Sequence, residues 1–385
     1  MMSQKRIQLK GITWNHSRGF TSMVATAQRF SELHPNIDIT WEKRSLQAFA
    51  DEPINELAKR FDLLIIDHPW AGFAGKTKVI LPLEKHLPKA FINDLAENTV
   101  GRSHESYSSN GHQFALAVDA ATPVASSRPD ILKKKKIKLP ETYADLLALA
   151  KQGLVVMPGI PQDTLMNFYM MCCTMGEDVC SSKEHVVSEE IGIKALQMLR
   201  ELVVEMDSQI FNWNPIQVYE AMTQTDKYAY CPWAYGYTNY SRRGYARKPL
   251  HFHDMIDIKG FGKAVSTLGG TGLAISAQTK ELETAIKYVE YVGSEECQKT
   301  IFFDNGGQPG HRKAWLNEHT NEVSENFFKN TLPTLDRAFL RPRYNGHMYF
   351  QDRAGSPIRE YLMHGGDEKK LLQQLNELYL KSLNI

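Results

Sequence analysis

The stretch ITWNHSRGFTSMVATAQRFSELHPNIDITW, residues 12–41, decides the fold. Residues 7–14 have the character of a β-strand, and apolar residues at helical spacing predict an amphipathic helix over 19–33 that ends before Pro35. Residues 37–42 alternate apolar and polar, as a strand does. The stretch therefore predicts a strand, a helix and a second strand in succession.

A third strand follows. A short helix around 53–60 precedes FDLLIID, residues 61–67, whose continuous apolar centre suits a strand covered on both faces. The β-α-β-α-β order implies a parallel sheet with right-handed crossovers. Ligands of such sheets bind beyond the carboxyl ends of the strands. We therefore expect one crevice to be lined by the side chains that follow the three strands: Trp14, Asn15, His16, Arg18, Lys43, Arg44, Asp67, His68 and Trp70.

Composition and charge exclude several classes. The chain has 385 residues, 42% hydrophobic and 23% charged, so it is globular, and its length favours two domains. A net charge of +1 argues against a nucleic-acid partner. No run approaches the roughly 18 apolar residues that span a bilayer, and the basic N-terminus lacks the apolar segment of a secretion signal. We expect a cytoplasmic protein as written, or a periplasmic or extracellular one whose signal peptide has been removed.

The cysteines indicate neither a disulfide framework nor a metal site. Five is an odd number, and Cys172, Cys173 and Cys180 crowd into nine residues. Vicinal cysteines chelate one ion poorly, and the HFHD cluster at 251–254 lacks a standard metal-binding spacing. MNFYMMCC, residues 166–173, is typical of a buried helix. We therefore expect no metal and no cofactor.

Five stretches in order resemble one family. After 12–41 come FDLLIIDHPW (61–70), ILPLEKHL (80–87), the segment 111–151 with LPETYADLLALAK, and the segment 268–315 with LGGTGLAISAQ and NGGQPGHRKAW. Together they resemble the periplasmic-type, sugar-type substrate-binding proteins of ABC importers over nearly the whole chain. The departures are Tyr143 in place of the usual Trp, and the absence of a signal peptide and a lipobox cysteine.

The resemblance implies an α/β fold with two lobes, of the type II periplasmic-binding-protein kind, and a ligand cleft between them. The first lobe would take residues 1–118 plus 268–308, and the second 119–267 plus 309–385. Hinge closure traps the ligand because both lobes contact it only in the closed state. The implied partners are a small-molecule ligand and, if the chain is exported, an ABC permease; we expect a monomer.

The candidate ligand-binding residues combine cations and aromatic rings. Several arginines at strand ends favour an anionic ligand, such as a sugar acid or another carboxylate, since the guanidinium fork matches a carboxylate. In YAYCPWAYGYTNY, residues 228–240, Pro232 and Gly236 argue for an exposed aromatic lining. The expected ligand-binding set is Trp14, His16, Arg18, Arg44, Asp67, His68, Asp119, Trp233, Tyr235, Gly270, Thr271 and Arg312.

An enzyme on the same scaffold is the alternative. His16, Asp67 and His68 could then supply acid–base chemistry. Neighbouring residues on a strand point to opposite sides, however, so a structural role for the pair at 67 and 68 is favoured over a catalytic dyad. Binding of a solute that is released unchanged is the first hypothesis.

Overall fold

The computed structural model describes residues 6–385, apart from the side chain of Asp51. The basic start at residues 1–5 lies outside the described residues. The chain divides into two compact units. Unit 1 comprises Met1–Ala121, Gly269–Glu322 and Arg343–Asn345; unit 2 comprises Thr122–Leu268, Val323–Pro342 and Gly346–Ile385.

The unit boundaries differ from the expected lobe boundaries in four segments. Residues 119–121, 309–322 and 343–345 belong to unit 1 although they were expected in the second lobe, and residue 268 belongs to unit 2 although it was expected in the first. A β-bridge between Asp119 and Pro309 ties the segments 119–121 and 309–322 to unit 1. The resemblance could not supply this pairing, because it joins residues that are far apart in the sequence.

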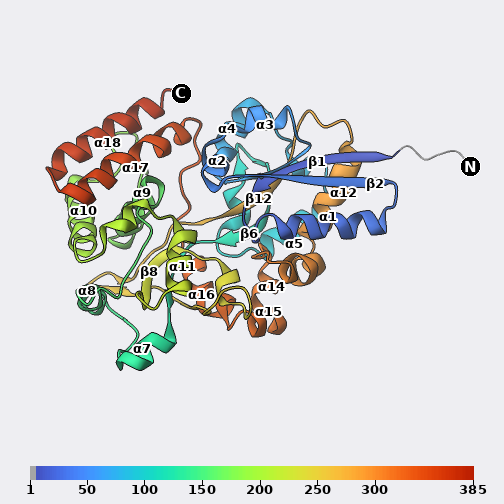
Figure 1. The fold of residues 1–385 in the computed structure, drawn as a ribbon. Helices are drawn as coiled ribbons and strands as arrows, with labels where there is room; N and C mark the ends of the chain where they lie inside the picture. The colour runs from blue at the N-terminus through green and yellow to red at the C-terminus, as the bar shows by residue number, and fades with distance from the viewer. Residues whose placement is uncertain (1–5) are drawn as a thin grey trace, which may run out of the picture. The chain divides into compact units, whose positions relative to one another are not determined.

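Unit 1 is built on a five-stranded sheet in the order β2-β1-β3-β12-β6 (Figure 1). β1 runs parallel to β2 and to β3, as the β-α-β-α-β order predicts, and β12 is antiparallel to β3 and β6. The carboxyl ends of β1, β2, β3 and β6 therefore meet the amino end of β12 at one sheet edge. The strands are β1 (Ile7–Trp14), β2 (Ile37–Arg44), β3 (Leu63–Ile66), β6 (Leu116–Ala121) and β12 (Gly269–Ile275).

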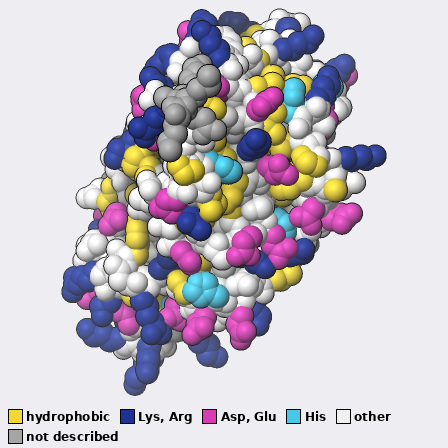
Figure 2. Space-filling model, turned by 90° about the vertical axis from the view of Figure 1, so that its right-hand side faces the viewer, with side chains coloured by type: hydrophobic (Ala, Val, Ile, Leu, Met, Phe, Trp, Pro, Cys, Tyr) yellow, Lys and Arg dark blue, Asp and Glu magenta, His cyan; other side chains and the backbone are white. Residues whose placement is uncertain are grey.

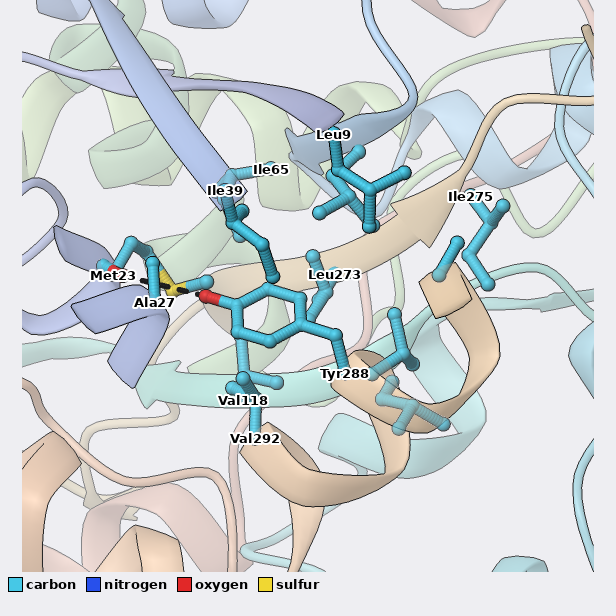
Figure 3. Packing of buried hydrophobic residues seen from close by; sticks show 14 of the residues in the cluster. Leu9, Met23, Ala27, Ile39, Ile65, Val118, Leu273, Ile275, Tyr288 and Val292 are labelled. Atoms are coloured by element: carbon cyan, nitrogen blue, oxygen red, sulfur yellow. Dashed lines mark hydrogen bonds between the residues drawn. The ribbon is translucent and has the colours of Figure 1, made fainter. Parts of the chain in front are cut away.

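The core of unit 1 lies between one face of this sheet and the helices α1 (Thr21–Leu33) and α12 (Leu282–Gly293). Figure 3 shows the ring of Tyr288, from α12, packed among aliphatic side chains of the strands. Its hydroxyl donates to the Met23 carbonyl oxygen at 3.3 Å and accepts from the Trp41 indole at 3.2 Å. These bonds satisfy the one polar atom that the tyrosine brings into the apolar layer.

All four residues of β3 are buried, which confirms the expectation of a strand covered on both faces. The predicted helices at 19–33 and 53–60 correspond to α1 and α3. The remaining elements of unit 1 and its border are α2 (Leu46–Asp51), α3 (Ile54–Ala58), α4 (Trp70–Thr77), η1 (Leu83–Lys85), α5 (Lys89–Glu97), α6 (Ser103–Ser106), β4 (Ser108–Ser109), β5 (His112–Gln113), α13 (Glu295–Cys297), η4 (Gln298–Phe302), α14 (Arg312–Leu316) and α15 (Glu318–Val323).

Unit 2 combines helices with a three-stranded antiparallel sheet in the order β8-β7-β9. Its strands are β7 (Pro123–Ser127), β8 (Tyr230–Tyr235), β9 (His251–His253), β10 (Asp257–Ile258) and β11 (Gly262–Lys263). Its helices are α7 (Pro129–Lys135), α8 (Tyr143–Ala150), α9 (Pro161–Thr174), α10 (Glu189–Val203), η2 (Ser208–Asn212), α11 (Pro215–Gln224), η3 (Thr238–Ser241), α16 (Phe327–Asp336), α17 (His347–His364) and α18 (Glu368–Ser382).

Helix α9 is the central helix of unit 2. Its residues are buried from Asp163 to Thr174, and it packs against α17 and α10, which confirms the buried helix predicted at 166–173. A helix that is apolar on every side has to be covered all round. The close packing of α17 against the start of α9 requires a glycine at position 355. A Cβ there would lie 2.1 Å from the Pro161 carbonyl oxygen.

Charges of both signs cover the surface. Figure 2 shows Lys, Arg, Asp and Glu side chains distributed over one face of the molecule, in keeping with the net charge of +1. Within residues 6–385, no helix combines the length and the apolar character that a bilayer crossing requires.

Candidate functional site

The strand order of unit 1 gathers most of the candidate ligand-binding residues at one sheet edge. Trp14 and Arg44 are paired in register as the last residues of β1 and β2, and Asp67 directly follows β3. Asp119, in β6, faces Thr271 near the start of β12. Residues from five separate segments therefore meet where the parallel strands end, which is the usual ligand position of such sheets.

Arg18 and Asp119 form a buried ion pair at this edge. Arg18 Nε donates to Asp119 Oδ2 at 2.7 Å, and its Nη2 donates to Oδ1, so that the contact is bidentate. Both side chains are almost completely buried. The parallel two-bond geometry is that of an ionised carboxylate and a guanidinium, so the pair carries no net charge. Removing one partner would leave the other charge buried and uncompensated.

The backbone around Asp119 completes this arrangement. Burial raises the pKa of Asp119, and the Arg18 guanidinium and the Thr271 backbone N–H oppose that shift. Gly270 adopts φ +105°, and a Cβ there would lie 2.3 Å from the Asp119 carbonyl oxygen. Gly270 is thus required for the close approach of β12 to β6, whereas a ligand contact for it stays a prediction.

His16 is a neutral acceptor and not a cation. Its Nδ1 accepts the backbone N–H of Arg18 at 3.0 Å, which places the proton on Nε2. Burial, reinforced by the neighbouring Arg18, lowers the pKa of His16 to about 3. The imidazole is therefore uncharged at neutral pH, and it is a poor choice for a general base that must accept a proton.

Arg44 is held by contacts within the fold. Nη1 donates to the Ala48 carbonyl oxygen at 3.0 Å and lies 3.3 Å from Glu52 Oε2, while Nη2 donates to the Ile65 carbonyl oxygen at 3.3 Å. Burial lowers the pKa of Arg44, although Glu52 opposes this. The side chain joins the end of β2 to α2 and β3, while its Nε is buried without a partner among the described residues.

Asp67 and His68 are adjacent and form a local contact. Asp67 Oδ1 accepts the backbone N–H of His68 at 2.9 Å and lies 3.4 Å from His68 Nδ1. His68 is completely buried, and its ring packs edge-on against Tyr107. The geometry suits the structural role favoured for this pair.

Two tryptophans at the same edge offer hydrogen-bond donors. The indole Nε1 atoms of Trp14 and Trp70 are buried and have no hydrogen-bond partner among residues 6–385. The Trp14 ring lies against the Phe49 ring and against the backbone of Gly19. A Cβ at Gly19 would lie 2.4 Å from the Trp14 ring. Buried donors are nearly always satisfied in folded proteins, so unsatisfied ones indicate a site for a ligand or for water.

Arg312 lies on α14. Its Nη1 donates to the Thr99 carbonyl oxygen at 3.1 Å, and its backbone N–H donates to the Asn98 carbonyl oxygen at 2.7 Å. The structure thus shows it tying α14 to the loop after α5.

In unit 2, the aromatic stretch at 228–240 is mainly a buried strand. Trp233 is completely buried and Tyr235 is partly buried, its hydroxyl 3.3 Å from Thr267 Oγ1. The expectation of an exposed lining is therefore wrong for Trp233. Pro232 sits at the bulge where β8, an edge strand, shifts register against β7, so proline does not end the strand.

Two buried polar residues of α9 were not among the residues predicted from the sequence. Asp163 and Asn167 are both buried, one helical turn apart, and Asn167 Nδ2 has no partner within the described residues. Burial raises the pKa of Asp163 to about 8. The Trp233 indole Nε1, in the same unit, is likewise buried and unpaired among the residues described. The sequence signal for these two residues was an aspartate and an asparagine four positions apart, on one face of a helix whose residues are mostly apolar.

Metal ligation receives no support from the geometry. Across residues 6–385 no group of three or more His, Cys, Asp or Glu side chains could hold an ion. His253 Nε2 lies 2.8 Å from Ser127 Oγ, and Asp254 pairs with Arg337. These contacts explain the polar cluster at 251–254 by ordinary hydrogen bonding.

Parallel strands whose carboxyl ends carry several polar and aromatic side chains form a suitable framework for binding a small solute. Residues 25–321 match the family described as bacterial extracellular solute-binding protein. Because that match spans more than half of the chain, the protein belongs to this family, whose members bind small solutes and work with ABC permeases.

Solved structures of low sequence identity share the fold. Maltose-bound MalE3 of T. maritima has 17% identity and a TM-score of 0.84, covering 98% of this chain and 100% of that one. An Agrobacterium radiobacter K84 solute-binding protein in complex with ribitol has 17% identity, a TM-score of 0.83 and coverages of 98% and 99%. An Agrobacterium vitis S4 protein with bound D-mannitol has 16% identity, a TM-score of 0.79 and coverages of 98% and 98%.

Proposed function

We propose that the protein binds a small, uncharged, polyhydroxylated solute, a sugar or a polyol, for uptake by an ABC importer. The observation that carries this proposal is a contrast at the sheet edge of unit 1. The charge of Arg18 is already neutralised by Asp119, whereas the donors of Trp14 and Trp70 are neutral and unsatisfied among the described residues. Neutral donors beside aromatic rings suit the hydroxyl oxygens and the C–H face of a sugar.

The anionic ligand expected from the arginine content has less support. Arg18 is paired with Asp119, Arg44 contacts Glu52 and two carbonyl oxygens, and His16 is uncharged at neutral pH. A carboxylate ligand would have to compete with Asp119 for the guanidinium, and the displaced carboxylate would then stay buried without a partner.

Related folds carry neutral ligands. The three structures named above contain maltose, ribitol and D-mannitol, none of which is charged. At 16–17% identity these ligands indicate a class of compound and do not identify one. The resemblance further implies capture by hinge closure, export from the cytoplasm, a monomeric state and delivery to a permease, and we include these in the proposal.

A catalytic role fits the site less well. The enzyme alternative relies on His16, Asp67 and His68, but His16 is a weak base and Asp67 holds the backbone of His68. We therefore propose that the solute is released chemically unchanged.

A matched ligand panel tests the proposal. Maltose, ribitol and D-mannitol would be compared with the acids D-gluconate and D-glucuronate by thermal shift and titration calorimetry. A neutral compound at about 100 times its Kd should stabilise the fold by about 2.7 kcal/mol, and the acids should not. Binding of the acids alone would overturn the neutral-ligand proposal. Proton NMR of the incubated mixture separates the alternatives, since a new product would indicate an enzyme.

A further inference from the structure

Three of the five cysteines lie around the end of α9 in unit 2. Cys172 and Cys173 immediately precede Thr174, the last residue of the helix, and Cys180 lies in the loop that follows. All five cysteines are free thiols in this structure. Cys172 and Cys173 are buried, while Cys180 is partly exposed.

The chain reverses after α9 and returns along the same helix. Gly176 adopts φ +94°, and the N–H groups of Gly176 and Glu177 donate to the carbonyl oxygens of Cys173 and Cys172 at 3.1 and 3.2 Å. This is the hydrogen-bonded C-terminal turn in which a glycine takes the left-handed position. Because the turn is tight, the residues that follow it are directed back towards the last turn of the helix.

The two thiols of Cys173 and Cys180 are brought together by this reversal. The Val179 N–H hydrogen-bonds the Cys173 sulfur, so that sulfur lies beside the residue that immediately precedes Cys180. The Cys180 thiol contacts the Tyr169 hydroxyl. Tyr169 lies one turn before Cys173 on α9, so their side chains share one face of the helix. The Cys180 sulfur therefore lies against the same face as the Cys173 sulfur.

The loop is anchored so that Cys180 cannot easily move away. Its N–H donates to the Val186 carbonyl oxygen at 2.7 Å, and its own carbonyl oxygen accepts from the Tyr379 hydroxyl of α18 at 3.3 Å. Cys180 also has φ +56°, a left-handed conformation that costs free energy for a residue with a side chain. The surroundings therefore hold the cysteine in an unfavourable backbone conformation next to a second thiol.

We propose that Cys173 and Cys180 form a disulfide when the chain folds in an oxidising compartment. The two thiols lose two protons and two electrons and form one S–S bond, and a disulfide such as oxidised glutathione is reduced to two thiols. This inference rests on the export that is part of the proposed function. The bond would fasten the end of α9 to the loop that α18 supports.

The folded, reduced protein should react slowly. Burial raises the pKa of Cys173 and of Cys180 to about 12, so little thiolate is present at neutral pH. Cross-linking is therefore expected during folding, before the thiols are buried. Cys172 is a near neighbour of both sulfurs, but the Val179 contact singles out Cys173 as the partner of Cys180.

Thiol counting after refolding tests the pair. The full chain would be unfolded in urea, refolded in a glutathione redox buffer, and titrated for free thiols under denaturing conditions. The wild-type count should fall from five to three. Cys173→Ser and Cys180→Ser should each keep four thiols, whereas Cys172→Ser and the distant control Cys297→Ser should each fall from four to two.

Peptide mapping of the wild type does not depend on the folding of any variant. Cleavage after Glu177 separates Cys180 from the two helical cysteines, so the cross-link should appear as one joined species that separates on reduction. Five thiols in the refolded wild type, or loss of the cross-link in Cys172→Ser and not in Cys173→Ser, would overturn the proposal. Since no ligand enters this assay, its outcome is independent of the ligand panel.

Discussion

At the scale of single residues, the indole N–H groups of unit 1 differ in what they contact. Trp14 Nε1 is buried without a partner among residues 6–385, whereas Trp315 Nε1 donates to the Pro309 carbonyl oxygen at 2.6 Å. The proposed function assigns the first donor to the ligand, whereas the second already serves the fold. This difference makes the two tryptophans a matched pair for mutation.

Trp14→Phe should weaken binding of the neutral ligand. The substitution removes the indole N–H and keeps an aromatic ring, so the loss should be about one hydrogen bond, or roughly 0.5–1.5 kcal/mol of binding free energy. Trp315→Phe should lower the melting temperature through its lost contact with Pro309 and leave the affinity unchanged. Titration calorimetry measures both, and an unaltered affinity in Trp14→Phe would remove Trp14 from the site.

Asp163 should make the stability of the protein depend on pH. Burial raises the pKa of its carboxyl from 3.8 to about 8, so the folded state keeps a proton that the unfolded state releases above about pH 4. The contribution of Asp163 to the free energy of unfolding should therefore fall as pH rises from about 4 to about 8, by at most about 1.4 kcal/mol per pH unit. Above this window both states are ionised and the contribution becomes constant.

Asp163→Asn should flatten this pH dependence, because the amide cannot ionise. Urea unfolding at several pH values between 4 and 8 measures the slope for wild type and variant. Glu184→Gln, at an exposed loop carboxyl, is the control and should leave the wild-type slope in place. If the slopes of wild type and Asp163→Asn coincide, burial does not shift this carboxyl.

At the scale of elements, the alternating periods of the first 67 residues were sufficient to predict three strands that run parallel, but not their order in the sheet. The polar residues at the ends of these strands followed directly, because parallel strands place their carboxyl ends together. The ion pair of Arg18 with Asp119 could not be predicted, since no local pattern relates residues 101 positions apart. For the same reason, the sequence alone does not predict that Asp119 and Glu52 are the carboxylate partners of Arg18 and Arg44.

The segment around Trp233 was misjudged for a different reason. Proline and glycine normally mark loops, but β8 is an edge strand, and its register shift against β7 accommodates Pro232. Asp163 and Asn167 were overlooked because the helix around them is apolar, which conceals isolated polar residues.

The pairing of β12 with β6 depends on one glycine. Gly270→Ala would place a Cβ 2.3 Å from the Asp119 carbonyl oxygen at φ +105°. Gly111 also has a positive φ, +77°, but a Cβ there would meet no atom within 4 Å. Gly111→Ala should cost about 1 kcal/mol in free energy of unfolding from backbone strain alone, and Gly270→Ala should cost about 1–3 kcal/mol more from the added clash. Equal losses in urea unfolding would contradict this account of the β12–β6 contact.

At the scale of the whole molecule, the net charge supplies little long-range attraction for a charged solute. The net charge is +1, and both signs are distributed over the face seen in Figure 2. Attraction between charges beyond the Debye length, about 10 Å at 0.1 M salt, is screened in any case. On the proposed function, selection of the solute should therefore come from short-range contacts, such as those proposed for the indole donors.

Binding of a neutral solute should accordingly be insensitive to salt. Between about 0.05 and about 0.5 M sodium chloride, the Kd measured by calorimetry should change by less than about twofold, because no ion pair forms between protein and ligand. An anionic ligand held by Arg18 would instead weaken as salt rises. A steep decline in affinity with salt would show that Arg18 exchanges Asp119 for the ligand, which would restore the anionic interpretation and exclude a neutral sugar or polyol as the solute.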